Sequence, residues 1–143
     1  MKKGILISLL LSIAFSCNKI VTGETLSQPD IKYIKSLHLL DDNEEIYKFY
    51  SEFKMKNAGN FFTNMRIATY WIDPRNDKKN KISYAFYKEI KSIDTVYNAG
   101  VTYSPYLLVT KRNGDSFKVY VNGEKDEIKS FFEEAINTWH KNE

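Results

Sequence analysis

Residues 61–73 read Phe-Phe-Thr-Asn-Met-Arg-Ile-Ala-Thr-Tyr-Trp-Ile-Asp and carry the strongest strand pattern in the chain. They predict the end of one strand, a tight turn over residues 63–65, and a second strand over residues 66–72. Side chains alternate between the two faces of a strand, so apolar residues fall on both faces of this second strand. We therefore expect it in the middle of the domain, with other elements covering it above and below.

The segment before this pair predicts a partner strand. Residues 46–56 alternate apolar and polar side chains, which is typical of a half-buried strand, with Phe49 and Phe53 on the buried face. The following Asn-Ala-Gly-Asn, residues 57–60, predicts a turn in which Gly59 adopts positive φ without steric cost.

More short strands follow, separated by turn residues. The last two of them flank Asn113-Gly114, a strong hairpin signal. Many short strands with turns at regular intervals predict a mainly β, antiparallel barrel or sandwich. The expected strands lie at residues 82–87, 92–97, 106–111 and 116–121.

Helical periodicity appears at the two ends of this β region. Residues 124–141 place Ile128, Phe131 and Trp139 on one apolar stripe, which predicts a C-terminal amphipathic helix packed on the core. Residues 29–39 predict a short N-terminal helix capped by Ser27.

An acidic run, Asp-Asp-Asn-Glu-Glu at residues 41–45, follows the first helix. Five oxygen-bearing side chains suggest calcium, because hard cations take oxygen ligands. The alternating ligand spacing and the glycine of the known calcium loop are both missing. We therefore expect a solvated acidic loop and no metal.

Length and charge exclude several classes of protein. The chain has 143 residues, which suits one domain, and a formal net charge of +3. Without Lys2 and Lys3 it carries 19 basic and 18 acidic residues. This balance gives no support for a nucleic-acid partner, whose phosphates require clustered positive charge.

The N-terminus has the pattern of a secretory signal. Met1-Lys2-Lys3 precedes an apolar run at residues 4–15, which is too short to span a bilayer. Ala14-Phe15-Ser16-Cys17 then resembles the lipobox of bacterial lipoproteins. This resemblance implies cleavage before Cys17, lipid on that cysteine, and attachment to a membrane, facing the periplasm or the cell surface. An ordinary signal peptide with an incidental cysteine is the alternative.

These patterns divide the chain into three parts. Residues 1–16 form the expected signal peptide, polar residues 17–28 a flexible tether, and residues 29–143 a single folded domain.

The order of strands and the final helix resembles the pleckstrin-homology-like (PH-like) fold. Within it, Thr63-Asn64-Met65-Arg66-Ile67 resembles the Thr-Asn-x-Arg-aliphatic turn of bacterial PH-like and GRAM-like domains. Such domains are bent antiparallel barrels or sandwiches with a C-terminal capping helix, and they are mostly binding or scaffolding modules. The resemblance implies neither catalytic residues nor a cofactor. In the turn itself, Arg66 is expected to bond a neighbouring carbonyl or carboxylate.

The leading functional hypothesis is a lipid-anchored, non-catalytic module of the cell envelope that binds a protein or another envelope component. An immunity-type lipoprotein that blocks a toxin is an alternative. An enzyme is not expected, because His38 and His140 stand alone at helix ends and no phosphate loop, zinc spacing or serine elbow is present. A third hypothesis is contact with anionic lipid through five lysines in two loops: Lys54, Lys56, Lys78, Lys79 and Lys81.

Overall fold

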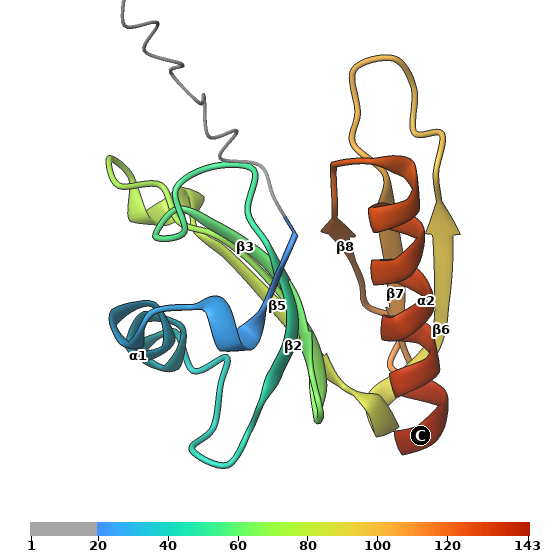
Figure 1. Cartoon of the computed structure of the whole chain (residues 1–143), viewed down its shortest axis with the longest axis horizontal. Helices are drawn as coiled ribbons and strands as arrows, with labels where there is room; N and C mark the ends of the chain where they lie inside the picture. The colour runs from blue at the N-terminus through green and yellow to red at the C-terminus, as the bar shows by residue number, and fades with distance from the viewer. Residues whose placement is uncertain (1–19) are drawn as a thin grey trace, which may run out of the picture.

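The structure is a computed structural model, and it describes residues 20–143. The expected signal peptide and Cys17 lie outside the described residues. Figure 1 shows two antiparallel sheets with one helix on the outer side of the first sheet and a longer helix beside the second.

The first sheet has the order β1-β2-β3-β4-β5 and the second has the order β6-β7-β8. In the first sheet the strands are β1 (Val21–Thr22), β2 (Ile46–Tyr50), β3 (Ala58–Thr63), β4 (Arg66–Trp71) and β5 (Lys81–Phe86). In the second they are β6 (Ile90–Val96), β7 (Tyr106–Lys111) and β8 (Ser116–Tyr120). The helices are α1 (Gln28–Ser36) and α2 (Lys125–Asn142), and three short 3-10 turns, η1 (Gly23–Thr25), η2 (Asp77–Lys79) and η3 (Tyr87–Glu89), complete the described elements.

The inner core lies between the two sheets and α2, and it confirms the predicted capping helix. Phe131 and Phe132 are fully buried, and Phe131 meets Phe62 of β3 edge-to-face with ring centroids 5.1 Å apart. Of the two predicted architectures, barrel and sandwich, the protein has the sandwich, because its strands form two separate sheets.

A second core covers the outer face of the first sheet. Ile34 of α1 packs there with Phe61, Ala68 and Tyr70, and all four are at most 2% exposed. On the opposite face of β4, Ile67 belongs to the inner core. The prediction that β4 is covered on both sides is therefore confirmed.

Helix α1 begins as predicted, with a reciprocal cap. The Ser27 hydroxyl accepts a hydrogen bond from the Asp30 N–H, and the Asp30 carboxylate accepts one from the Ser27 N–H. The helix ends at Ser36, three residues before the predicted end, and His38 then adopts a positive φ of 60°. This turn directs Leu39 into the outer core.

Strand β2 differs from its prediction in length and in burial. It ends at Tyr50 instead of residue 56, and Phe53, expected on the buried face, is 61% exposed in the following loop. Ile46, Phe49 and Tyr50 are all buried, because the register shifts near Ile46 and because both faces of the strand are covered. The prediction of a half-buried strand with alternating exposure was therefore wrong.

Gly59 was predicted in a turn, but it lies inside β3. A Cβ atom added there would sit 2.3 Å from Cε1 of the Tyr70 ring, so the absent side chain leaves room for a buried aromatic group. The reversal instead occupies the preceding residues, where the N–H of Asn57 donates to the carbonyl of Lys54. Close packing, and not positive φ, explains this glycine.

The expected flexible tether is also corrected where the structure describes it. Val21 pairs with Phe49 and Thr22 with Lys48, so β1 forms the edge of the first sheet. The turn η1 and the Ser27 cap then connect β1 directly to α1. From Val21 onward the segment therefore belongs to the folded domain.

The acidic loop is not uniformly solvated, because Glu44 is buried against Arg66. Arg66 Nε and Nη2 donate to the two Glu44 carboxylate oxygens at 2.9 and 2.7 Å. The side chains of Arg66 and Glu44 are 2% and 0% exposed. Arg66 Nη1 also donates to the carbonyl of His38, and Asp41 lies 3.0 Å from Nη2. The prediction that Arg66 bonds a neighbouring carbonyl or carboxylate is confirmed, and it bonds both.

Thr63 joins the same network from the end of β3. Its hydroxyl donates to Glu44 at 2.6 Å and accepts from the N–H groups of Met65 and Arg66, both at 2.9 Å. The Tyr87 hydroxyl donates to the carbonyl of Thr63. The tight turn is thus held by side chains from three separate segments.

Replacing Glu44 with glutamine should leave the buried guanidinium with only the largely exposed Asp41 carboxylate as a counter-charge. We expect Glu44→Gln to reduce the free energy of unfolding by about 3–5 kcal/mol, measured by urea denaturation. Asp42→Asn is the control, because Asp42 pairs with Lys35 at the surface and is 92% exposed. Equal urea midpoints for the two variants would contradict the structural role of the buried pair.

Candidate functional site

A groove runs between the first sheet and β8, and we refer to it as the inter-sheet groove. Its volume is about 460 Å³. A second hollow of about 440 Å³ continues it, because Ser83, Ser116 and Phe117 line both. The walls of the first part are formed by Glu52, Ala58, Asn60, Thr69, Tyr70, Trp71, Lys81, Ser83, Ser116, Phe117, Lys118 and Tyr120.

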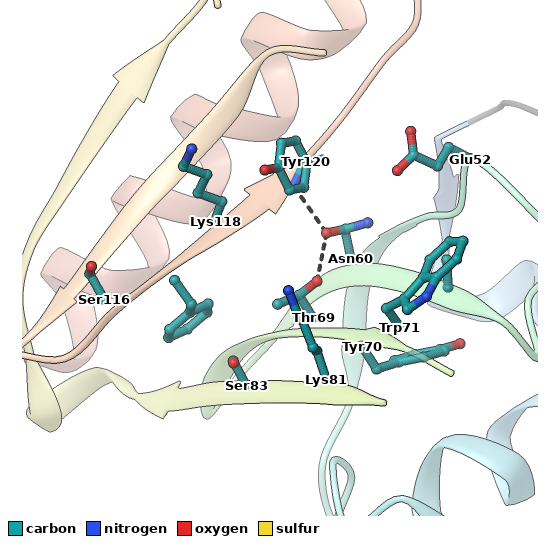
Figure 2. Close-up of a pocket in the computed structure, with 12 residues that line it drawn as sticks. Glu52, Asn60, Thr69, Tyr70, Trp71, Lys81, Ser83, Ser116, Lys118 and Tyr120 are labelled. Atoms are coloured by element: carbon teal, nitrogen blue, oxygen red, sulfur yellow. Dashed lines mark hydrogen bonds between the residues drawn. The ribbon is translucent and has the colours of Figure 1, made fainter. Parts of the chain in front are cut away.

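Asn60 joins the two sheets beside this groove (Figure 2). Its side-chain oxygen accepts from the Thr69 hydroxyl at 2.8 Å and from the Tyr120 N–H at 3.0 Å. Asn60 is 3% exposed, so both bonds are shielded from water. A β4 side chain and the β8 backbone therefore share one acceptor, which fixes the spacing of the sheets at this point.

Aromatic and basic side chains shape the rest of the wall. Trp71 remains 39% exposed and meets Phe53 edge-to-face, with ring centroids 5.7 Å apart. Lys118 Nζ lies 4.6 Å from the centroid of the Tyr106 ring. Together with Lys81 and the wall hydroxyls, these groups can hydrogen-bond a polar or anionic partner and pack against its apolar parts.

Tyr70 lies behind the wall of the groove, and its hydroxyl is not exposed to react with a ligand. Burial raises the pKa of its hydroxyl well above the usual value, and the hydroxyl donates to the carbonyl of Met55. It therefore stays protonated at any physiological pH and acts as a structural hydrogen-bond donor.

The two histidines are placed in different parts of the domain. His38 lies in the turn after α1, and His140, in the last turn of α2, stacks on Trp139 with ring centroids 4.5 Å apart. In residues 20–143, no group of three or more His, Cys, Asp or Glu side chains could hold a metal ion. Neither α1 nor α2 combines the length and the apolar character that crossing a bilayer requires.

The five predicted lysines are carried by two loops at one end of the first sheet (Figure 1). Lys54 and Lys56 lie between β2 and β3, Lys78 and Lys79 lie between β4 and β5, and Lys81 is the first residue of β5. The two loops are tied together, because the Ile72 N–H donates to the carbonyl of Asn57 and the side-chain amide of Asn57 donates to the carbonyl of Ile72. We call this region the lysine-bearing end.

Of these lysines only Lys81 lines the inter-sheet groove. Sequence reasoning did not identify Asn60, Thr69 or Tyr120 as site residues. One feature of the sequence could have indicated Asn60 and Thr69. Both are polar residues within otherwise apolar strands, and a buried polar side chain must find hydrogen-bond partners. The bond from the Tyr120 N–H to Asn60, which spans 60 positions in the chain, could be found only in the tertiary structure.

Two antiparallel sheets packed as a sandwich, with a C-terminal helix on the inner core, define a PH-like fold. A solved structure with this architecture is similar to the chain: a DUF1696 family protein with a pleckstrin-homology domain from Shewanella loihica PV-4. Its TM-score is 0.52 at 16% sequence identity, and the alignment covers 82% of this chain and 96% of that one. The predicted PH-like fold is therefore confirmed. No protein-family model and no curated protein matches the sequence.

Removing the Asn60 side chain should loosen the contact between the sheets. We expect Asn60→Ala to accelerate hydrogen exchange at the Tyr120 amide and to lower stability by about 1–3 kcal/mol, because a buried N–H loses its acceptor. Thr69→Val is the matched control, since it removes the other donor and keeps the Asn60–Tyr120 bond. The bridging role fails if the Tyr120 amide exchanges equally fast in both variants.

Proposed function

We propose that this protein is a lipid-anchored, non-catalytic PH-like binding module of the bacterial cell envelope. The observation that carries the binding role is the inter-sheet groove, an open, mixed polar and aromatic surface on a fold whose similar solved structure contains a pleckstrin-homology domain. The anchoring role is supported by Ser16-Cys17 directly after the apolar N-terminal run. The groove and the anchor are separate parts of the proposal and are tested separately.

The position of β1 is compatible with a membrane close to the domain. Because Val21 pairs with Phe49, Ile20 lies beside the end of β2, from which the Lys54 loop departs. Cys17 precedes Ile20 by three residues, which span at most about 10 Å when fully extended. A lipid on Cys17 would therefore hold the lysine-bearing end near the bilayer. Stable attachment requires more than one acyl chain, as a diacylglyceryl group with an acylated amine would supply.

The anchor is tested by removing its thiol. We expect Cys17→Ala to lose metabolic palmitate label and to move from the membrane fraction to the soluble fraction of cells. Ser16→Gly is the control, because it keeps a small residue before the cysteine and should stay labelled. Membrane association of Cys17→Ala that survives salt washing would refute the lipid anchor.

A second candidate function is contact with anionic lipid headgroups at the lysine-bearing end. Residues 51–57 and 72–81 carry six basic side chains against three acidic ones, although residues 20–143 as a whole are balanced in charge. Phe53 also stands 61% exposed beside them, and an exposed aromatic ring suits a membrane interface. The basic side chains are Lys54, Lys56, Arg75, Lys78, Lys79 and Lys81, and the acidic ones are Glu52, Asp73 and Asp77.

Vesicle sedimentation of the unlipidated Cys17→Ala protein tests this contact without the anchor. We expect it to bind phosphatidylglycerol vesicles, not phosphatidylcholine vesicles, and to lose binding as salt is added. Reversing Lys54 and Lys56 to glutamate should abolish binding, whereas reversing Lys88 and Lys91, far along the fold, should not. Binding that is equal to both kinds of vesicle and independent of salt would exclude contact with anionic lipid as the function.

A further inference from the structure

Strand β5 ends the first sheet and presents unpaired backbone groups. The Ile72 N–H bonds the Asn57 carbonyl, and the antiparallel register then directs the amides of Lys81, Ser83 and Ala85 toward β4. The amide groups of Ile82 and Tyr84 consequently point away from the sheet. Within the described residues, no hydrogen bond satisfies the N–H or the carbonyl of either.

Strand β8 presents a second edge to the same space. The Val121 N–H bonds the Pro105 carbonyl, so the amides of Ser116, Lys118 and Tyr120 point away from β7. The Tyr120 N–H is already taken by Asn60. Residues from both edges, 82–84 and 116–117, line the continuation of the inter-sheet groove. This part of the groove is therefore bounded by two strands that do not pair with each other.

The edge of β5 lacks the usual protection against added strands. Natural edges are shortened, charged or interrupted by proline, whereas β5 has six residues and places its one lysine at the start. Ile82 and Tyr84 are 42% and 38% exposed. The edge of β5 is protected only at its last residue, because the Phe86 N–H donates a hydrogen bond to the Glu89 carboxylate. The open part of the edge is thus residues 82–84.

The groove and its continuation carry a small excess of positive charge. Three lysines, Lys81, Lys111 and Lys118, line the two hollows, against two acidic residues, Glu52 and Asp115. An added strand would place every second side chain toward these lysines. Carboxylates at those positions complement the groove, and the intervening side chains would lie beside Ile82 and Tyr84.

We propose that the inter-sheet groove binds an acidic, extended peptide segment of a partner protein, which adds to β5 as a sixth, antiparallel strand. Backbone hydrogen bonds to Ile82 and Tyr84 supply the affinity, and Lys81 and Lys118 select the acidic side chains. The inference rests on the proposed binding role and is independent of the Cys17 anchor.

The test uses the full-length chain in detergent and a synthetic peptide of alternating valine and glutamate. Binding is followed by amide chemical shifts and by hydrogen exchange. We expect slowed exchange at the Ile82 and Tyr84 amides on addition of the peptide, with the Tyr70 amide, inside the sheet, unchanged. The same peptide with lysine in place of glutamate should bind at least about tenfold more weakly, because it loses the ion pairs with two lysines.

Two variants separate strand addition from other modes of binding. Ile82→Pro removes an outward N–H that makes no bond within the sheet and should weaken binding about tenfold, whereas Ile82→Val keeps that N–H and should weaken binding much less. Lys118→Glu leaves the β5 backbone unchanged and should reverse the preference between the glutamate and lysine peptides. This charge reversal also keeps the proposal testable if the proline variant fails to fold.

Several outcomes would overturn the proposal. These are no binding of the glutamate peptide at millimolar concentration, equal binding by Ile82→Pro, or shifts confined to other surfaces. A dimer in solution whose association is abolished by Ile82→Pro would show that the edge pairs with a second copy instead. Loss of membrane attachment in Cys17→Ala with normal peptide binding would support this inference, and retained attachment would count only against the anchor.

Discussion

The charge of Arg66 is buried within the protein, and the arrangement of the first sheet depends on its compensation by Glu44. Taking a guanidinium out of water is costly, and the cost is offset only when a partner and further hydrogen bonds are present. Glu44 supplies the carboxylate, the His38 carbonyl supplies an acceptor, and Thr63 bonds the same carboxylate. The ion pair therefore ties the loop after α1 to the turn between β3 and β4, which holds the two central strands in register.

With that turn in place, the central strands carry a core on each face. The outer core is closed by α1 and the inner one by α2 and the second sheet. The sheets meet at Asn60, but β5 and β8 do not pair, so a groove remains where a closed barrel would have continuous hydrogen bonding. The same packing that stabilises the domain thus leaves one region with unpaired backbone groups and exposed side chains.

The proposed binding role would draw on this arrangement. The groove offers backbone groups, hydroxyls, lysines and aromatic rings on rigid strands, and its walls are set by bonds between distant segments. The lysine-bearing end lies beside Ile20, a short distance along the chain from Cys17. The two proposed contacts, a membrane at the lysine-bearing end and a peptide along β5, meet at Lys81, which belongs to both surfaces.

Local patterns in the sequence determined the elements whose causes are local. The Asn113-Gly114 hairpin, the Ser27 cap, the stripe on α2 and the Thr63–Arg66 turn were all predictable, because period, capping and turn chemistry act over a few residues. Sequence alone did not determine the burial of Glu44, the position of Gly59 inside β3, the pairing of β1 or the groove around Asn60. Each of these depends on a partner 11 to 60 residues away, namely Arg66, Tyr70, Phe49 and Tyr120. Such contacts were decided by the tertiary structure, because only folding brings those side chains and strands together.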